Sequence, residues 1–183
     1  MTKGCIGRNH YEKEAVSLQY EKIIFIGRSF GGTYVPLLPK FDSRIEELGL
    51  IYPVVDNSSC GSINREETNE DFMRSMKLDG YYHLYRGILG PRWQKHLRDE
   101  DGLSPMDNIR FLRNAKVFIG HGRKDRCVHY TKSITYYEKI LKEHPLRKDQ
   151  FALRLYPGGH SPETSGPAVR DCLIWLGIEQ VTP

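Results

Sequence analysis

Long apolar segments and strong charge of one sign are both missing from this 183-residue sequence. No apolar run approaches the roughly 20 residues that a membrane-spanning helix needs, and the N-terminal Met1–Cys5 does not lead into a signal-peptide core. The net charge is only +4, and lysines and arginines are interleaved with carboxylates along the chain. We therefore expect a cytoplasmic protein that binds neither membranes nor nucleic acid.

Metal-binding and phosphate-binding patterns are also missing. The cysteines at positions 5, 60, 127 and 172 are widely spaced and form no Cys-x-x-Cys pair, and no histidine pair has the His-x-x-x-His spacing of a helical zinc site. No Gly-Lys-Ser/Thr or Gly-x-Gly-x-x-Gly loop follows the first strand. We expect reduced, mostly buried thiols, no bound metal and no cofactor.

Short apolar runs alternate with helical patterns along the chain. The apolar fraction of 39% and the charged fraction of 27% are typical of one globular domain spanning residues 1–183. Strands are predicted at Lys22–Ile26, Leu48–Val55, Ala115–Gly120 and Gln150–Tyr156, and helices at Tyr11–Leu18, after Gly32 towards Leu38, at Thr131–His144 and from about Pro167. This alternation predicts an α/β three-layer sandwich with a mostly parallel sheet, whose catalytic groups lie at the carboxyl ends of the strands.

Residues 57–103 differ from the rest in being polar, helical only in patches and interspersed with aromatic side chains. A long excursion between two strands is more often functional than not, so we interpret it as a lid-like insert. Its aromatic residues are candidates to line a substrate pocket, namely Tyr81, Tyr82, Tyr85 and Trp93. The alternative is that these side chains dock the insert onto the core.

The first predicted strand runs directly into Gly27-x-Ser29-x-Gly31, followed by Gly32. Between a strand and a helix, this pattern is typical of a nucleophile elbow, a sharp turn that exposes a serine hydroxyl. A serine that merely caps the following helix is the alternative.

A serine nucleophile needs an imidazole to take its proton and a carboxylate to orient that imidazole. Asp125 and His160 each follow a predicted strand, in the order Ser, acid, His. Asp56 competes for the acid role because it also follows a strand, and Asp125 could instead form a turn or cap a helix. His160 could be an ordinary loop histidine, and we interpret His121 as structural because it lies so near Asp125 in sequence.

Four motifs resemble those of an α/β-hydrolase catalytic domain: Gly27-Arg28-Ser29-Phe30-Gly31-Gly32, Ser104-Pro105, His121-Gly122-x-x-Asp125-x-x-Val128 and Tyr156-Pro157-x-x-His160. They are most similar to the C-terminal half of the prolyl-oligopeptidase-like branch, with its dipeptidyl and acylaminoacyl peptidases, and to related small esterases. The resemblance extends from about Glu21 to the end, except for the insert. It implies Ser29 as nucleophile, Asp125 as acid, His160 as base and the backbone N–H of Phe30 as one oxyanion donor.

The sequence departs from this family pattern upstream of Ser29. The family's sheet has further strands there, and a loop that supplies a second oxyanion donor; neither has an evident counterpart in this chain. The strand at 22–26 is then expected at a sheet edge, covered by the N-terminal segment, by a second copy in a homo-oligomer or by a partner chain. Loss of one oxyanion donor costs about 10²–10³ in rate where it has been measured.

These observations lead to a serine hydrolase that cleaves a small carboxylic ester, with a thioester, an amide or a short peptide as less favoured substrates. Arg28 is a further candidate substrate-binding residue because it lies beside Ser29. Acyl transfer to another acceptor uses the same residues and stays open. The alternative is a truncated or subunit-like relative that is inactive, or active only with a partner chain.

Overall fold

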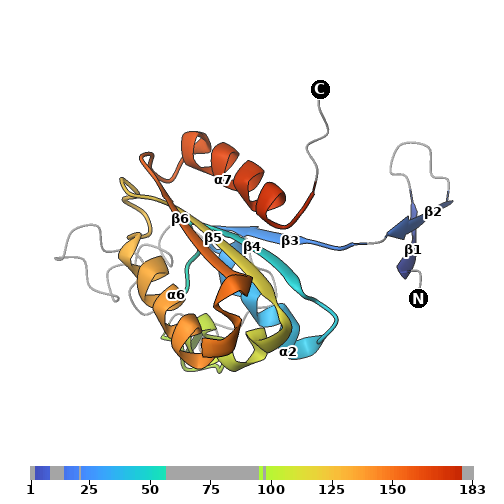
Figure 1. Ribbon diagram of the computed structural model, residues 1–183, viewed down its shortest axis with the longest axis horizontal. Helices are drawn as coiled ribbons and strands as arrows, with labels where there is room; N and C mark the ends of the chain where they lie inside the picture. The colour runs from blue at the N-terminus through green and yellow to red at the C-terminus, as the bar shows by residue number, and fades with distance from the viewer. Residues whose placement is uncertain (1–2, 9–14, 21, 57–94, 97, 179–183) are drawn as a thin grey trace.

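A computed structural model describes residues 3–8, 15–20, 22–56, 95–96 and 98–178 (Figure 1). All structural statements below concern this part of the chain. Most of the predicted insert, including Tyr81, Tyr82, Tyr85 and Trp93, lies outside it.

The centre of the fold is a parallel sheet of four strands. These are β3 (Phe25–Arg28), β4 (Glu47–Ile51), β5 (Lys116–Gly122) and β6 (Phe151–Tyr156), in the spatial order β3-β4-β5-β6. All three neighbouring pairs are parallel, which confirms the predicted sheet. Within the described residues β3 lies at one end of this strand order, as the sequence predicted, and β6 lies at the other.

β4 ends four residues earlier than the apolar run Leu48–Val55 suggested. Tyr52 has a φ of 39°, in the left-handed region, and a strand cannot continue through that conformation. Its N–H nevertheless bonds to the carbonyl of Gly120 at 2.6 Å, and residues 52–55 stay buried. Residues 52–55 are apolar because they are buried, although they are not in a strand. For this reason the sequence pattern placed the end of the strand too late.

Helices cover both faces of the sheet, which confirms the three-layer architecture. α6 (Thr131–Glu143) lies on one side and α7 (Pro162–Trp175) on the other (Figure 1). β5 supplies both cores by alternation, since Val117 and Ile119 pack in the cluster that contains α6, whereas Phe118 packs with α7 residues. No helix in the described part is both long and apolar enough to cross a membrane.

The predicted helices are present with some changes. After Ser29 the chain forms α1 (Gly31–Tyr34), the 3₁₀ turn η1 (Val35–Leu37) and α2 (Leu38–Phe41). The predicted helix towards Leu38 is thus broken into short pieces, and Pro36 lies in the 3₁₀ turn between them. α6 turns Tyr136 and Ile140 fully inward, and Tyr137 and Leu141 pack half-buried against the same core. Three further 3₁₀ segments are η3 (Pro105–Asp107), η4 (Ile109–Asn114) and η5 (Pro145–Gln150).

The predicted helix at Tyr11–Leu18 is wrong. Residues 15–20 form a strand, β2 (Ala15–Tyr20), which pairs antiparallel with β1 (Lys3–Arg8). The pairing partner was not visible in a local pattern, and backbone bonds to β1 outweigh a short helical periodicity. This hairpin is a separate sheet beyond the start of β3 (Figure 1), so the described part of the N-terminal segment does not pair with the β3 edge.

The two glycines of the Gly-x-Ser-x-Gly turn are predicted to differ sharply in their tolerance of a side chain. A Cβ at Gly27 would lie 2.4 Å from the Gly31 carbonyl oxygen and 2.7 Å from a Val35 methyl, whereas a Cβ at Gly31 would meet nothing within 4 Å. Gly27→Ala should lower the free energy of unfolding by about 1–3 kcal/mol or more. Gly31→Ala, in a helix, should be neutral or stabilising by up to about 1 kcal/mol. Denaturant unfolding of both variants checks this, and equal losses would contradict the tight packing of the turn around Gly27.

Candidate active site

The chain segments that leave β3, β4, β5 and β6 meet at one edge of the sheet, because the strands are parallel. Ser29 follows β3, Asp125 follows β5 and His160 follows β6. This is the carboxyl edge, where ligands bind in open parallel sheets.

Ser29 lies on a strained turn between β3 and α1. Its φ is 51°, a conformation that costs a non-glycine residue about 1–2 kcal/mol. Backbone hydrogen bonds hold the turn, with the Ser29 N–H donating to Ile51 O at 3.0 Å and the Ser29 carbonyl accepting from Gly32 and Val54 at 2.9 and 3.1 Å. The Thr33 hydroxyl adds a buried bond to Val54 O at 2.8 Å. The turn has the backbone geometry of a nucleophile elbow, and strain of this kind is common at functional sites.

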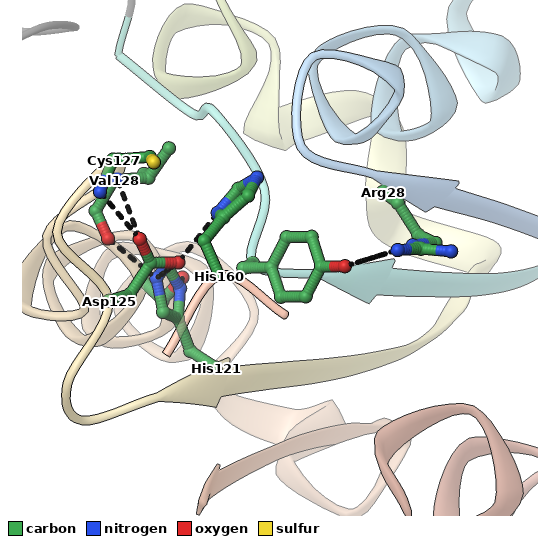
Figure 2. Close-up of polar contacts among 8 residues, drawn as sticks. Arg28, His121, Asp125, Cys127, Val128 and His160 are labelled. Atoms are coloured by element: carbon green, nitrogen blue, oxygen red, sulfur yellow. Dashed lines mark hydrogen bonds and ion pairs between the residues drawn. The ribbon is translucent and has the colours of Figure 1, made fainter. Parts of the chain in front are cut away.

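Asp125 is a buried carboxylate with four donors around it. Its Oδ1 accepts the backbone N–H groups of Cys127 and Val128 at 2.8 and 2.9 Å. Its Oδ2 lies 2.8 Å from Nδ1 of His160 and 3.3 Å from Nε2 of His121 (Figure 2). Its side chain is 0% exposed, so these contacts replace the water that a carboxylate otherwise needs.

The balance of these effects lowers the pKa of Asp125 below its ordinary value. Burial alone would raise the pKa, but the hydrogen bonds from His121, His160 and the Val128 N–H favour the charged form and outweigh burial. Asp125 is therefore a carboxylate at neutral pH.

His160 is oriented by this carboxylate. Because Asp125 is charged, the hydrogen bond fixes the proton of a neutral His160 on Nδ1, where it is donated to Oδ2. Nε2 is then the nitrogen that can accept a proton. The side chain is 21% exposed, so part of the imidazole faces solvent. An imidazole held this way is suited to act as a general base.

His121 is structural, in agreement with the interpretation from the sequence. It is fully buried, and its Nε2–H lies 2.9 Å from the Val128 carbonyl, while Nδ1 lies 2.7 Å from the Ser133 hydroxyl. It ties the turn of Asp125 to the start of α6.

Asp56, the competing acid, has another partner. Its Oδ2 lies 3.0 Å from Nζ of Lys132 on α6. The carboxylate that bonds to His160 is that of Asp125.

Tyr52 borders the site, although no motif in the sequence singled it out. Its ring centroid lies 4.1 Å from that of His160, and its hydroxyl accepts two hydrogen bonds from Arg28, at 2.6 and 3.0 Å. In Figure 2, Arg28 lies well apart from the Asp125–His160 pair. The Arg28 side chain, a candidate substrate contact, is thus held by Tyr52.

The structure brings Asp125 and His160 together, but within the described residues no hydrogen bond joins Ser29 to His160. Residues Ile51 and Tyr52 connect the two, since Ile51 bonds to the Ser29 N–H and Tyr52 packs against His160. Catalytic hydrogen bonds are often long or poorly aligned before substrate binds.

The comparisons with known proteins agree with this architecture. No protein-family model and no curated protein sequence matches the chain. Among solved structures, the chain is similar to the acylaminoacyl peptidase of Pyrococcus horikoshii, with 12% identity, a TM-score of 0.54 and coverage of 86% of this chain and 23% of that one. It is similar to oligopeptidase B from Trypanosoma brucei with covalently bound antipain, at 19% identity, TM-score 0.53 and coverage of 86% and 22%.

A puromycin-hydrolyzing peptidase of Mycobacterium tuberculosis is similar to the same extent, with 15% identity, a TM-score of 0.52 and coverage of 86% and 22%. The chain thus spans less than a quarter of the length of each of these three proteins. All are α/β-hydrolases. The chain therefore has the α/β-hydrolase fold, as the resemblance of its motifs implied, and corresponds to part of these larger proteins.

The lowered pKa of Asp125 predicts how folding stability depends on pH. A carboxylate whose folded pKa is depressed stabilises the fold above its unfolded pKa of about 3.9, and this contribution is lost as pH falls towards the folded pKa. Asp125→Asn should lower the free energy of unfolding by roughly 1.5–3 kcal/mol at pH 7. The difference from wild type should shrink below about pH 4.

Denaturant unfolding of both proteins between pH 3 and 7, at roughly one-unit steps across the titration range of a carboxyl, measures this difference. Asp56→Asn, which removes a partly exposed ion pair with Lys132, is the matched control and should cost about 1 kcal/mol or less. A difference between Asp125→Asn and wild type that is independent of pH would contradict the assigned charge state.

Proposed function

We propose that this protein is a serine hydrolase in which Ser29, His160 and Asp125 act as nucleophile, general base and orienting acid. The observation that carries the proposal is the hydrogen bond between His160 Nδ1 and the buried Asp125 carboxylate, at 2.8 Å, on the sheet edge where the Ser29 turn also lies. The α/β-hydrolase fold and the left-handed conformation of Ser29 support the same assignment.

In this mechanism the Ser29 hydroxyl attacks the substrate carbonyl while Nε2 of His160 takes its proton. Asp125 stabilises the imidazolium that forms. His160 then protonates the leaving group, and the acyl-enzyme is released by water through the same base. The Phe30 N–H, next to the nucleophile, is the proposed oxyanion donor.

A small carboxylic ester is the proposed substrate, with a thioester or amide as the nearest alternatives. The peptidases among the similar structures are far longer chains, of which this chain covers less than a quarter, so they support the fold without favouring a peptide substrate. Arg28 and the insert residues Tyr81, Tyr82, Tyr85 and Trp93 are proposed substrate contacts. Acyl transfer to an acceptor other than water would use the same three residues.

A second candidate is a subunit-like hydrolase that acts only when another chain, or a second copy, pairs with β3. Among the described residues β3 lies at the end of the strand order, and an edge strand presents unpaired backbone groups, which favours this candidate. A partner there would also adjoin the Ser29 turn.

A fluorophosphonate probe, which reacts with activated serines, tests the nucleophile. Wild-type protein should be labelled, Ser29→Ala should not, and the added mass should map to Ser29. Ser43→Ala is the matched control, because Ser43 is an exposed serine in the loop before β4 and its loss should leave labelling unchanged. A folded wild-type protein that is not labelled would sink the first candidate, and labelling only in an oligomeric fraction would favour the second.

The acid role predicts unequal effects of two Asp→Asn changes. Asp125→Asn should slow ester hydrolysis on the order of 10⁴-fold in kcat, because an amide no longer favours the reactive tautomer of His160. Asp56→Asn should change kcat by less than about 10-fold, since its partner is Lys132. Steady-state kinetics on p-nitrophenyl esters measure both. A larger loss for Asp56→Asn would move the acid to Asp56.

A further inference from the structure

Cys127 stands beside the Asp125–His160 pair and has no part in the proposed mechanism. A carboxylate oxygen of Asp125, Sγ of Cys127 and a ring nitrogen of His160 all lie within 4.8 Å of one another. Two of the three come from the loop after β5 and the third from the loop after β6 (Figure 2). The spacing of Asp125, Cys127 and His160 in the sequence does not indicate a metal site, because only the folded sheet brings His160 next to the other two residues.

The chemistry of these three atoms matches one class of ligand. A carboxylate, a thiolate and an imidazole together suit zinc and similar borderline-soft divalent cations, whereas Mg²⁺ and Ca²⁺ prefer oxygen alone. In a tetrahedral zinc site, ligand atoms about 2.0–2.3 Å from the metal lie roughly 3.3–3.6 Å apart. The Asp125–His160 contact of 2.8 Å must open by about half an ångström for this, and the thiol must approach by on the order of 1 Å.

The residues around the three ligand atoms allow these shifts and would hold the ligands in place around a bound cation. Cys127 is exposed, so its side chain can rotate without disturbing the core and leaves a path for a cation. Asp125 is already oriented, because its other oxygen, Oδ1, accepts two backbone N–H bonds that do not compete with the metal. Hydrogen bonds from protein groups to a ligating side chain commonly fix the orientation of that side chain at a metal. Three protein ligands leave a fourth position for water.

We propose that a zinc-class cation binds to Asp125, Cys127 and His160 and thereby inhibits the hydrolase. The cation takes the place of the proton on His160 Nδ1. That proton shifts through solvent to Nε2 of the same ring, so the imidazole stays neutral, and the thiol proton of Cys127 leaves to solvent. The hydrogen bond that orients His160 is lost, and Nε2, which now carries the ring proton, cannot accept the proton of Ser29. The inhibitory role rests on the proposed function, whereas the binding site itself does not.

Cobalt(II) is the probe for binding, because a cobalt–thiolate bond gives a charge-transfer absorption band that oxygen and nitrogen ligands do not. Chelator-treated protein titrated with Co²⁺ should develop this band at one cation per chain, and Zn²⁺ should abolish it by competition. Cys127→Ser should remove the band and weaken Zn²⁺ binding by more than about 10-fold, the smallest loss that even indirect partners of a metal cause. His129→Gln removes an exposed imidazole from the same loop and is the matched control, with binding unchanged.

Fluorophosphonate labelling with and without Zn²⁺ then tests inhibition. Zinc should slow the labelling of wild type and of His129→Gln, and should leave that of Cys127→Ser unaffected at the same concentration. Absence of the cobalt band, or a band that survives in Cys127→Ser, would overturn the site. Binding without any labelling of wild type would leave the site standing and reject the hydrolase, whereas labelling that zinc does not slow would reject inhibition alone.

Discussion

The buried charge of Asp125 is the constraint on which the site depends. A carboxylate with no exposed atom is costly unless hydrogen bonds replace its hydration. Here the replacements come from three places: the backbone of its own loop, His121 at the end of β5, and His160 after β6. Satisfying one charge therefore fixes two loops and the strand end between them.

The parallel sheet makes this convergence possible. β5 and β6 are adjacent and run in the same direction, so the loops that follow them leave the sheet side by side. Gly122 keeps them close, since a Cβ there would lie 2.4 Å from the Gly158 carbonyl oxygen. A side chain at position 122 would push the His160 loop away, so the short Asp125–His160 bond depends on this glycine as well as on the two partners.

Much of this arrangement could be predicted from the sequence, for identifiable physical reasons. Buried parallel strands are near-continuous apolar runs, so β3, β4 and β5 could be predicted, while β6 was indicated by its alternating pattern. Residues that follow parallel strands must share an edge. That placed Asp125 and His160 together. The strand pattern alone left Asp56 as a competitor of Asp125, because both follow strands, and the resemblance of the motifs favoured Asp125. In the structure Lys132 on α6 pairs with Asp56, and His160 pairs with Asp125.

Other features were beyond local pattern. The β1–β2 hairpin was predicted in part as a helix because its stability lies in pairing with a separate segment. Tyr52 went unnoticed because an aromatic residue in a buried run is usually core, and Cys127 because a lone cysteine carries no pattern. Both residues are of interest because they lie beside His160, which is far from each of them in the sequence.

Two of the three non-glycine residues with positive φ in the described part of the chain lie on the carboxyl edge of the sheet, and the third is Asp99. Ser29 and Tyr52 both adopt left-handed conformations, at a cost of about 1–2 kcal/mol each. The two are linked, since the Ser29 N–H bonds to the carbonyl of Ile51, directly before Tyr52, and the Tyr52 N–H bonds to Gly120 on β5. Relaxing either residue would break a bond that holds the other strand end. Residues Ile51 and Tyr52, at the carboxyl end of β4, thus bond to the Ser29 turn on one side and pack against His160 on the other. This segment therefore helps to fix the distance between Ser29 and His160.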